Sequence, residues 1–89
     1  MFKKGEIYYS LRQYDKAKTE YKSFTSAYPN SKLAADAYYW IGKSAQNLSQ
    51  NEEAIFNFDK VFNSYKNSEL ASASILEMGL IYRSSKNNA

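Results

Sequence analysis

Nine carboxylates are the main candidates for acid–base chemistry in this 89-residue chain, because the sequence contains no histidine and no cysteine. Their absence removes imidazole catalysis, thiol nucleophiles, disulfides and Cys/His zinc sites. A carboxylate pair that hydrolyses a glycoside needs a cleft and one raised pKa, and the sequence marks no such pair. It also lacks a glycine-rich phosphate loop and a GxSxG motif. We expect no catalytic residue, no metal ligand and no cofactor, and hence a non-enzymatic protein.

The charges are dispersed along the chain. The net charge is +3, and the densest lysine group, Lys16, Lys18 and Lys22, alternates with Asp15 and Glu20. Opposite charges at this spacing are helix neighbours and are typical of a solvated helix face. We therefore expect no nucleic-acid partner. No stretch approaches the ~18 consecutive apolar residues of a membrane span, so we expect no direct membrane span either.

The sequence repeats itself with a period of 37 residues. Comparing each residue with the one 37 positions later gives eleven identities, whereas unrelated pairs at ordinary residue frequencies would give roughly three or four. A repeat of this length is typical of stacked helical units. The repeated residues include Gly5/Gly42/Gly79, Ala17/Ala54, Tyr28/Tyr65, Asn30/Asn67, Ser31/Ser68 and Leu33/Leu70.

Apolar and aromatic residues recur three and four positions apart within each unit, which is the spacing of one helix face. One such run is Tyr14, Ala17, Tyr21, Phe24 and Tyr28. The pattern predicts an all-α chain of antiparallel helices over about residues 2–11, 14–28, 32–48, 51–65 and 69–85. We expect an α-solenoid of about two and a half repeats: about 1–30, about 31–67, and the first helix of a third unit over about 68–86.

The predicted boundaries carry capping residues. Ser49-Gln50-Asn51-Glu52 has the form of a capping box ahead of an apolar run. Ser31 and Ser68 stand where N-caps are needed. Pro29 follows a helix that it could not continue. Asn30 and Asn67 suit the left-handed positions that end helices.

The small and aromatic residues resemble the pattern of the tetratricopeptide repeat family. That pattern has a small residue, usually glycine, late in the first helix, alanine and a bulky residue in the second, and then proline. Two features depart from it: Lys66 stands where a second proline would be, and the period is 37 rather than about 34. The residues that match are Gly5, Tyr8, Tyr14, Ala17, Tyr21 and Pro29, then Tyr38, Ile41, Gly42, Ala54 and Phe58, then Gly79 and Tyr82.

One junction is similar to a bacterial-envelope subgroup of that family. Tyr28-Pro29-Asn30-Ser31 is followed by Ala34, Ala37, Tyr39 and Gly42. The subgroup includes the C-terminal domain of the Tol-Pal-associated proteins (YbgF/CpoB type) and the outer-membrane-assembly lipoprotein BamD. The resemblance implies a periplasmic protein-binding module of the Tol-Pal system that coordinates cell division. The alternatives are a BamD-like assembly scaffold and an accessory domain of a larger enzyme, and the alternative location is the cytoplasm.

The resemblance also implies a binding surface. The first helix of each pair lines the inner, concave face of such a stack, and a partner protein or peptide segment would bind there. Tyr39 follows the core-facing Tyr38, so we expect it to point away from the core. Trp40 has the character of a packing residue. The residues predicted on the concave face are Phe2, Glu6, Tyr9, Asp36, Tyr39, Lys43, Asn47, Leu76, Leu80 and Arg83.

The last predicted helix is apolar on nearly all sides. It carries Ile75, Leu76, Met78, Leu80 and Tyr82, and such a helix needs cover on more than one side. We expect the chain to be part of a longer protein or to self-associate through residues 75–82.

Overall fold

Apolar residues spaced three and four apart give five helices, as the sequence predicts. The computed structural model describes residues 1–87. The helices are α1 (Phe2–Ser10), α2 (Tyr14–Ala27), α3 (Ala34–Asn47), α4 (Asn51–Ser64) and α5 (Leu70–Asn87). They confirm the all-α prediction, and no strand occurs among the described residues. The predicted bounds differ by one or two residues at most ends.

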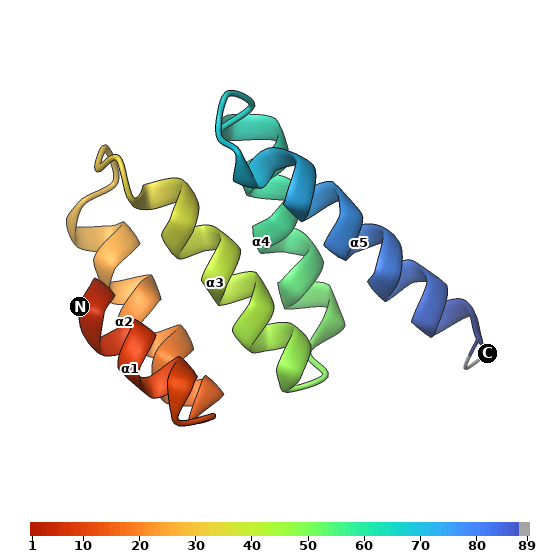
Figure 1. Cartoon of the computed structure of the whole chain (residues 1–89), viewed down its shortest axis with the longest axis horizontal. Coiled ribbons are helices and arrows are strands. Elements are labelled where there is room, and N and C mark those ends of the chain that lie inside the picture. The colour runs from red at the N-terminus through yellow and green to blue at the C-terminus, as the bar shows by residue number, and fades with distance from the viewer. Residues whose placement is uncertain (88–89) are drawn as a thin grey trace.

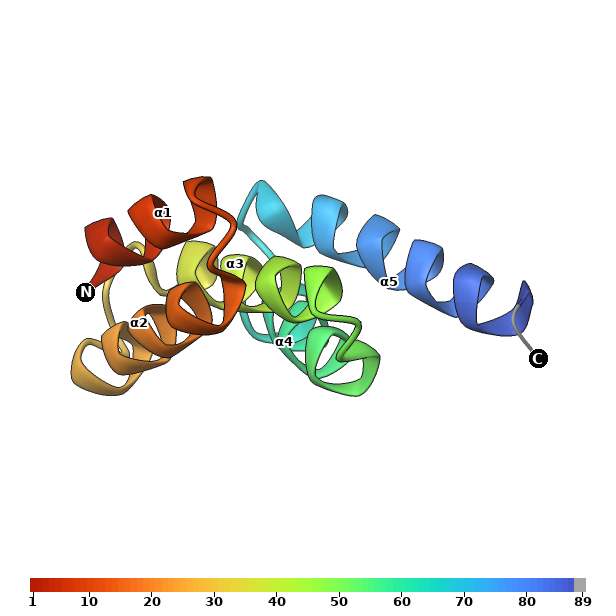
Figure 2. The same ribbon diagram turned by 90° about the horizontal axis from the view of Figure 1, so that it is seen from below.

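The helices form two layers of a slab measuring 38 × 29 × 17 Å. Successive helices run antiparallel side by side (Figure 1), and each packs on the next in the chain. Seen from the side, α1, α3 and α5 form one layer and α2 and α4 the other (Figure 2). In this view α3 lies lower than α1 and than the start of α5, and the outer face of this three-helix layer is the side away from α2 and α4. We call this the concave face.

Two glycines let aromatic rings pack directly against helix backbone. A Cβ added to Gly5 would lie 2.8 Å from Cε1 of Tyr21, and one added to Gly42 would lie 2.7 Å from Cε1 of Phe58. Real Cβ atoms do not approach ring carbons so closely, so each crossing requires glycine. The two crossings are 37 residues apart and place the second helix of each pair against the first.

The core follows the same repeat. One cluster is built around Tyr21, Ala17 and Ile41, and the other around Phe58, Ala54 and Val61. Tyr38 and Trp40 are half-buried and pack against both clusters, so α3 joins the two units. The small alanine side chains beside the large rings allow the helices to pack closely, at the density typical of a protein interior.

Left-handed residues end α1 and α3, and here the predicted capping box is wrong. Arg12 and Ser49 have φ values of 62° and 61°. The N–H of the next residue, Gln13 or Gln50, donates to the carbonyl five residues back, Tyr8 or Ala45. This is the Schellman arrangement. Ser49 therefore terminates α3, and Gln50 is the N-cap residue of α4 without a side-chain cap hydrogen bond.

The prediction that Ser31 caps α3 is wrong, because the N-cap residue is Leu33 and it makes no side-chain cap hydrogen bond. Ser31 and Ser68 instead stabilise the turns before α3 and α5. The Oγ atoms of Ser31 and Ser68 accept hydrogen bonds from the N–H groups of Leu33 and Leu70, each at 3.1 Å. The expectation for Asn30 and Asn67 is wrong, because neither has a positive φ. The long junction turns through hydrogen bonds from Ser31 and Ser68 to the carbonyls of Tyr28 and Tyr65, and it needs no left-handed residue.

Candidate functional site

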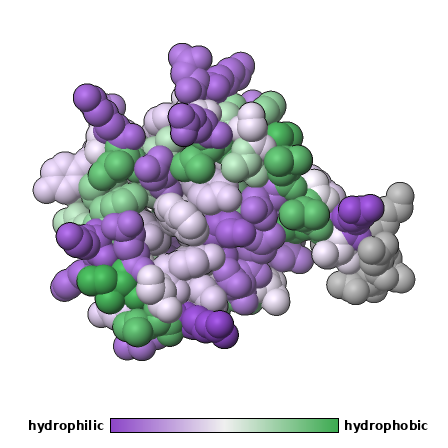
Figure 3. Space-filling view, in the orientation of Figure 1, coloured by the Kyte–Doolittle hydropathy of each residue, from purple (hydrophilic) through white to green (hydrophobic). Residues whose placement is uncertain are grey.

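The concave face is the part of the molecule where polar and aromatic side chains of several helices meet. Pale and hydrophilic residues cover the middle of this face, and most hydrophobic patches lie toward its edges (Figure 3). Asp36 and Lys43, both predicted here, are partly exposed, and Asn47 is exposed. Their positions along α3 are four and seven residues apart, which keeps them on one side of the helix.

Aromatic rings and one hydrogen bond join α1 to α3. The ring of Tyr9 meets Trp40 edge to face, with centroids 5.0 Å apart, and meets Tyr14 at 5.1 Å. The Nδ2–H of Asn47 donates to the Tyr9 hydroxyl at 3.1 Å. Trp40 also meets Tyr39 at 5.3 Å. Tyr9, Trp40 and Asn47 are therefore held in place in the free protein.

A cavity of about 140 Å³ opens between α1 and α3. Its lining consists of Glu6, Tyr9 and Ser10 from α1, Tyr21 from α2 and Trp40 from α3. Burial raises the pKa of the Tyr21 hydroxyl, and the nearby Glu6 carboxylate raises it further. Tyr21 remains a neutral hydrogen-bonding group at any physiological pH. We call these five residues the α1/α3 pocket.

Glu77 joins α3 to α5. Its Oε2 accepts from the Lys43 ammonium at 3.2 Å and from the Tyr39 hydroxyl at 3.4 Å, and its Oε1 accepts from the Gln46 amide at 3.2 Å. Burial raises the pKa of Tyr39, and the Glu77 carboxylate raises it further. No pattern within one repeat predicts this cluster, because Glu77 lies 31 to 38 residues from its three partners in the chain.

Two of the predicted concave residues are instead packing residues. Tyr39 is only 8% exposed and lies in a core cluster, with its ring 5.5 Å from that of Phe58. The expectation that it points away from the core is wrong. The next helix pair explains this, since α5 covers the side of α3 that would be open in an isolated pair. Phe2 is half-buried against Tyr21 and Phe24 of α2.

The predicted residues of α5 occupy the end of the stack. Leu76, Leu80 and Arg83 are exposed, Leu76 by 69%. They lie 37 residues after Tyr39, Lys43 and Gln46, the three residues of α3 that contact Glu77. Gly79 has no atom within 4 Å of an added Cβ, unlike Gly5 and Gly42. The side of α5 that corresponds to the covered side of α3 is open.

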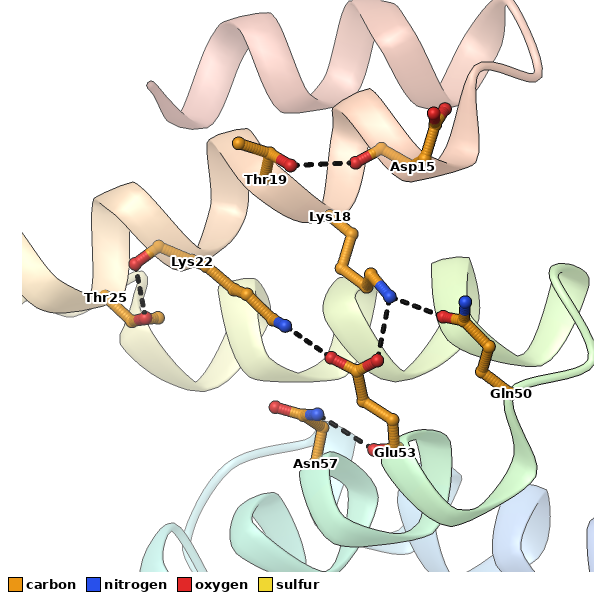
Figure 4. Close-up of polar contacts among 8 residues, drawn as sticks. All are labelled: Asp15, Lys18, Thr19, Lys22, Thr25, Gln50, Glu53 and Asn57. Carbon is orange, nitrogen blue, oxygen red and sulfur yellow. Dashed lines mark hydrogen bonds and ion pairs between the residues drawn. The ribbon is translucent and has the colours of Figure 1, made fainter.

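The opposite layer holds an ion network rather than a basic patch. The ammonium of Lys18 lies 2.7 Å from Oε1 of Glu53 and also donates to Gln50, and Lys22 pairs with the other oxygen of Glu53 (Figure 4). Burial alone would raise the pKa of Glu53, but the two lysines outweigh it and hold that pKa below its usual value. Two of the three clustered lysines are thus used to join α2 to α4.

A family described as tetratricopeptide repeat matches residues 1–31 and 36–68. The search of curated proteins finds no relative that matches this chain. Among the described residues, no helix is both long and apolar enough to cross a membrane.

Proposed function

The chain belongs to the tetratricopeptide repeat family, whose repeats serve as protein–protein interaction modules, and we propose that it binds a segment of a partner protein on its concave face. The observation that carries this proposal is the α1/α3 pocket, which combines aromatic rings with the Glu6 carboxylate. Tyrosine and tryptophan are enriched at binding hot spots. The ring contacts and the Asn47 hydrogen bond hold the pocket in place. A preformed groove pays little ordering entropy when a partner docks.

We further propose that the partner is a bacterial envelope protein and that the module works in the periplasm as a non-enzymatic component of a Tol-Pal-like system. The support is the similarity of the junction Tyr28-Pro29-Asn30-Ser31 and the following Ala34 and Gly42 to that subgroup. An assembly scaffold of the BamD kind would use the same fold. Flanking sequence separates the two: an upstream coiled coil favours the first, and a lipobox cysteine with about five repeats favours the second.

The test is capture of partners from envelope extract with two matched variants. Ser10 is exposed and lines the α1/α3 pocket, so Ser10→Trp fills it. Ser23 is exposed on α2, and Ser23→Trp adds the same bulk to the opposite layer. We expect the wild type and Ser23→Trp to retain the same partner and Ser10→Trp to lose it. Equal capture by both variants would remove the pocket from the proposal. Tyr39→Ala is unsuitable here, because Tyr39 is buried and its loss would destabilise the fold.

A second copy of the chain is the occupant we propose for the open side of α5. Leu76 and Leu80 are 69% and 52% exposed, and Ile75 and Tyr82 are exposed beside the uncovered Gly79. In an antiparallel α5–α5 pair, a two-fold axis between residues 79 and 82 would bring the Tyr82 ring of each copy over Gly79 of the other. Sedimentation should then show a concentration-dependent dimer that Leu76→Glu abolishes and Glu69→Gln does not. A monomeric wild type at all concentrations would contradict this.

A further inference from the structure

We infer that the α1/α3 pocket receives an arginine or lysine side chain of the partner segment. This inference rests on the proposed function and specifies the ligand of the pocket. The pocket volume of about 140 Å³ is close to the ~150 Å³ of an engineered cavity that accepts benzene. It therefore has room for the end of one side chain and none for a helix. Recognition at this point must come from a single protruding group.

The lining fits a cation. Glu6 supplies a carboxylate to the lining of the pocket, and no Lys or Arg nitrogen among residues 1–84, whose side chains the structure describes, lies within the 4.0 Å ion-pair distance of it. The rings of Tyr9, Tyr21 and Trp40 supply the π faces and edges around it. Tryptophan is the best of the aromatic partners for a cation, and a guanidinium can stack on a ring while it pairs with a carboxylate.

The neighbouring cation does not compete for the pocket. Lys43 is the lysine of α3 on this face, and it is paired with Glu77 on the α5 side. The carboxylate of Glu77 is in turn occupied by Tyr39 and Gln46. Two acidic residues of the concave face therefore differ in role: Glu77 is saturated by internal partners, whereas Glu6 has none among residues 1–84.

An anion or a purely apolar group fits the same lining less well. The Glu6 carboxylate would repel a carboxylate or phosphate, and a purely apolar group would leave that carboxylate without a counter-charge. A positively charged group is attracted both by the Glu6 carboxylate and by the aromatic rings of the lining. The ligand is therefore the cationic end of a side chain and not the acidic C-terminus of a peptide.

Trp40 gives a direct readout, because it is the only tryptophan of the chain and lines the pocket. The probes are the tripeptide amides acetyl-Gly-Arg-Gly and its citrulline counterpart, which keeps the shape of arginine without its charge. Titrated up to about 10 mM, the arginine peptide should change Trp40 fluorescence and bind at least about fivefold more tightly than the citrulline peptide. The variant Glu6→Gln should lose this preference. Glu69→Gln, which removes an exposed carboxylate in the turn before α5, should keep it.

Three results would overturn the inference: no binding of either peptide, equal binding of both, or an unchanged arginine preference in Glu6→Gln with native circular dichroism. The proposed function fails separately. If Ser10→Trp abolishes partner capture but the arginine preference is absent, the concave face binds a partner of different chemistry. If Ser10→Trp leaves capture unchanged, the pocket is not part of the partner-binding surface, whichever peptide binds more tightly.

Discussion

The ring of Phe58 lies directly on the backbone of Gly42, with Cε1 only 2.7 Å from the position of an added Cβ. Tyr21 lies on Gly5 in the same way. These two contacts set how closely the two helices of each pair approach, α1 to α2 and α3 to α4. Gly42 and Phe58 therefore support the binding surface without lining the α1/α3 pocket.

The three glycines should respond differently to the same change. Gly42→Ala and Gly5→Ala force the ring away from the backbone and should lower the free energy of unfolding by about 1–3 kcal/mol. Gly79→Ala meets no atom within 4 Å and should raise it by up to about 1 kcal/mol through helix propensity. Urea denaturation of dilute protein measures all three. A loss at Gly79 equal to that at Gly42 would mean that α5 is covered in solution.

Glu77 should contribute more to stability than other carboxylates of the chain. Its side chain is 17% exposed and accepts hydrogen bonds from three residues of α3. Glu77→Gln should lower the free energy of unfolding by about 1–2 kcal/mol. The substitution removes the charge that pairs with Lys43 and places a second amide group beside the hydrogen-bond donors of α3. Glu69→Gln is the control, since Glu69 is exposed. Equal unfolding midpoints for the two variants would show that the cluster contributes nothing.

The network of Glu53 should appear as acid sensitivity. Because the folded-state pKa of Glu53 lies below its usual value, its contribution is present above the unfolded-state pKa and is lost as the pH falls through the folded-state pKa. Glu53→Gln should therefore lower the free energy of unfolding by about 1 kcal/mol near pH 7 and by distinctly less near about pH 3. Denaturation at both pH values measures this, with Glu52→Gln, at an exposed neighbouring residue, as control. A cost that does not change with pH would contradict the assignment.

The repeat made most of the fold predictable. The glycine, alanine and aromatic residues that recur 37 positions apart predict helix pairs, and those pairs form as expected. The errors came from residues whose neighbours belong to other units. Ser49 matched a capping pattern, but the chain reversal after α3 places it in the left-handed conformation. Tyr38 and Tyr39 point about 100° apart on α3, and both α4 and α5 pack there, so the pattern within one helix could not decide which of them is buried.

The candidate site was predicted only in outline. Glu6, Tyr9, Lys43 and Asn47 were expected on the concave face from the helix that carries each. Ser10 was missed, Trp40 was interpreted mainly as a packing residue, and the hydrogen bonds of Glu77 depend on three residues of another unit. Such contacts arise only when the units are stacked at a particular angle, which no spacing within one unit encodes.

Mapping the contact surface of a captured partner by amide chemical shifts tests the central claim most directly. On titration with that partner, the shifts should concentrate on Glu6, Ser10, Trp40, Lys43 and Asn47, with the indole N–H of Trp40 among the largest. Shifts concentrated instead on α2 and α4, around Lys18 and Glu53, would show that the partner binds the opposite layer and would contradict the account.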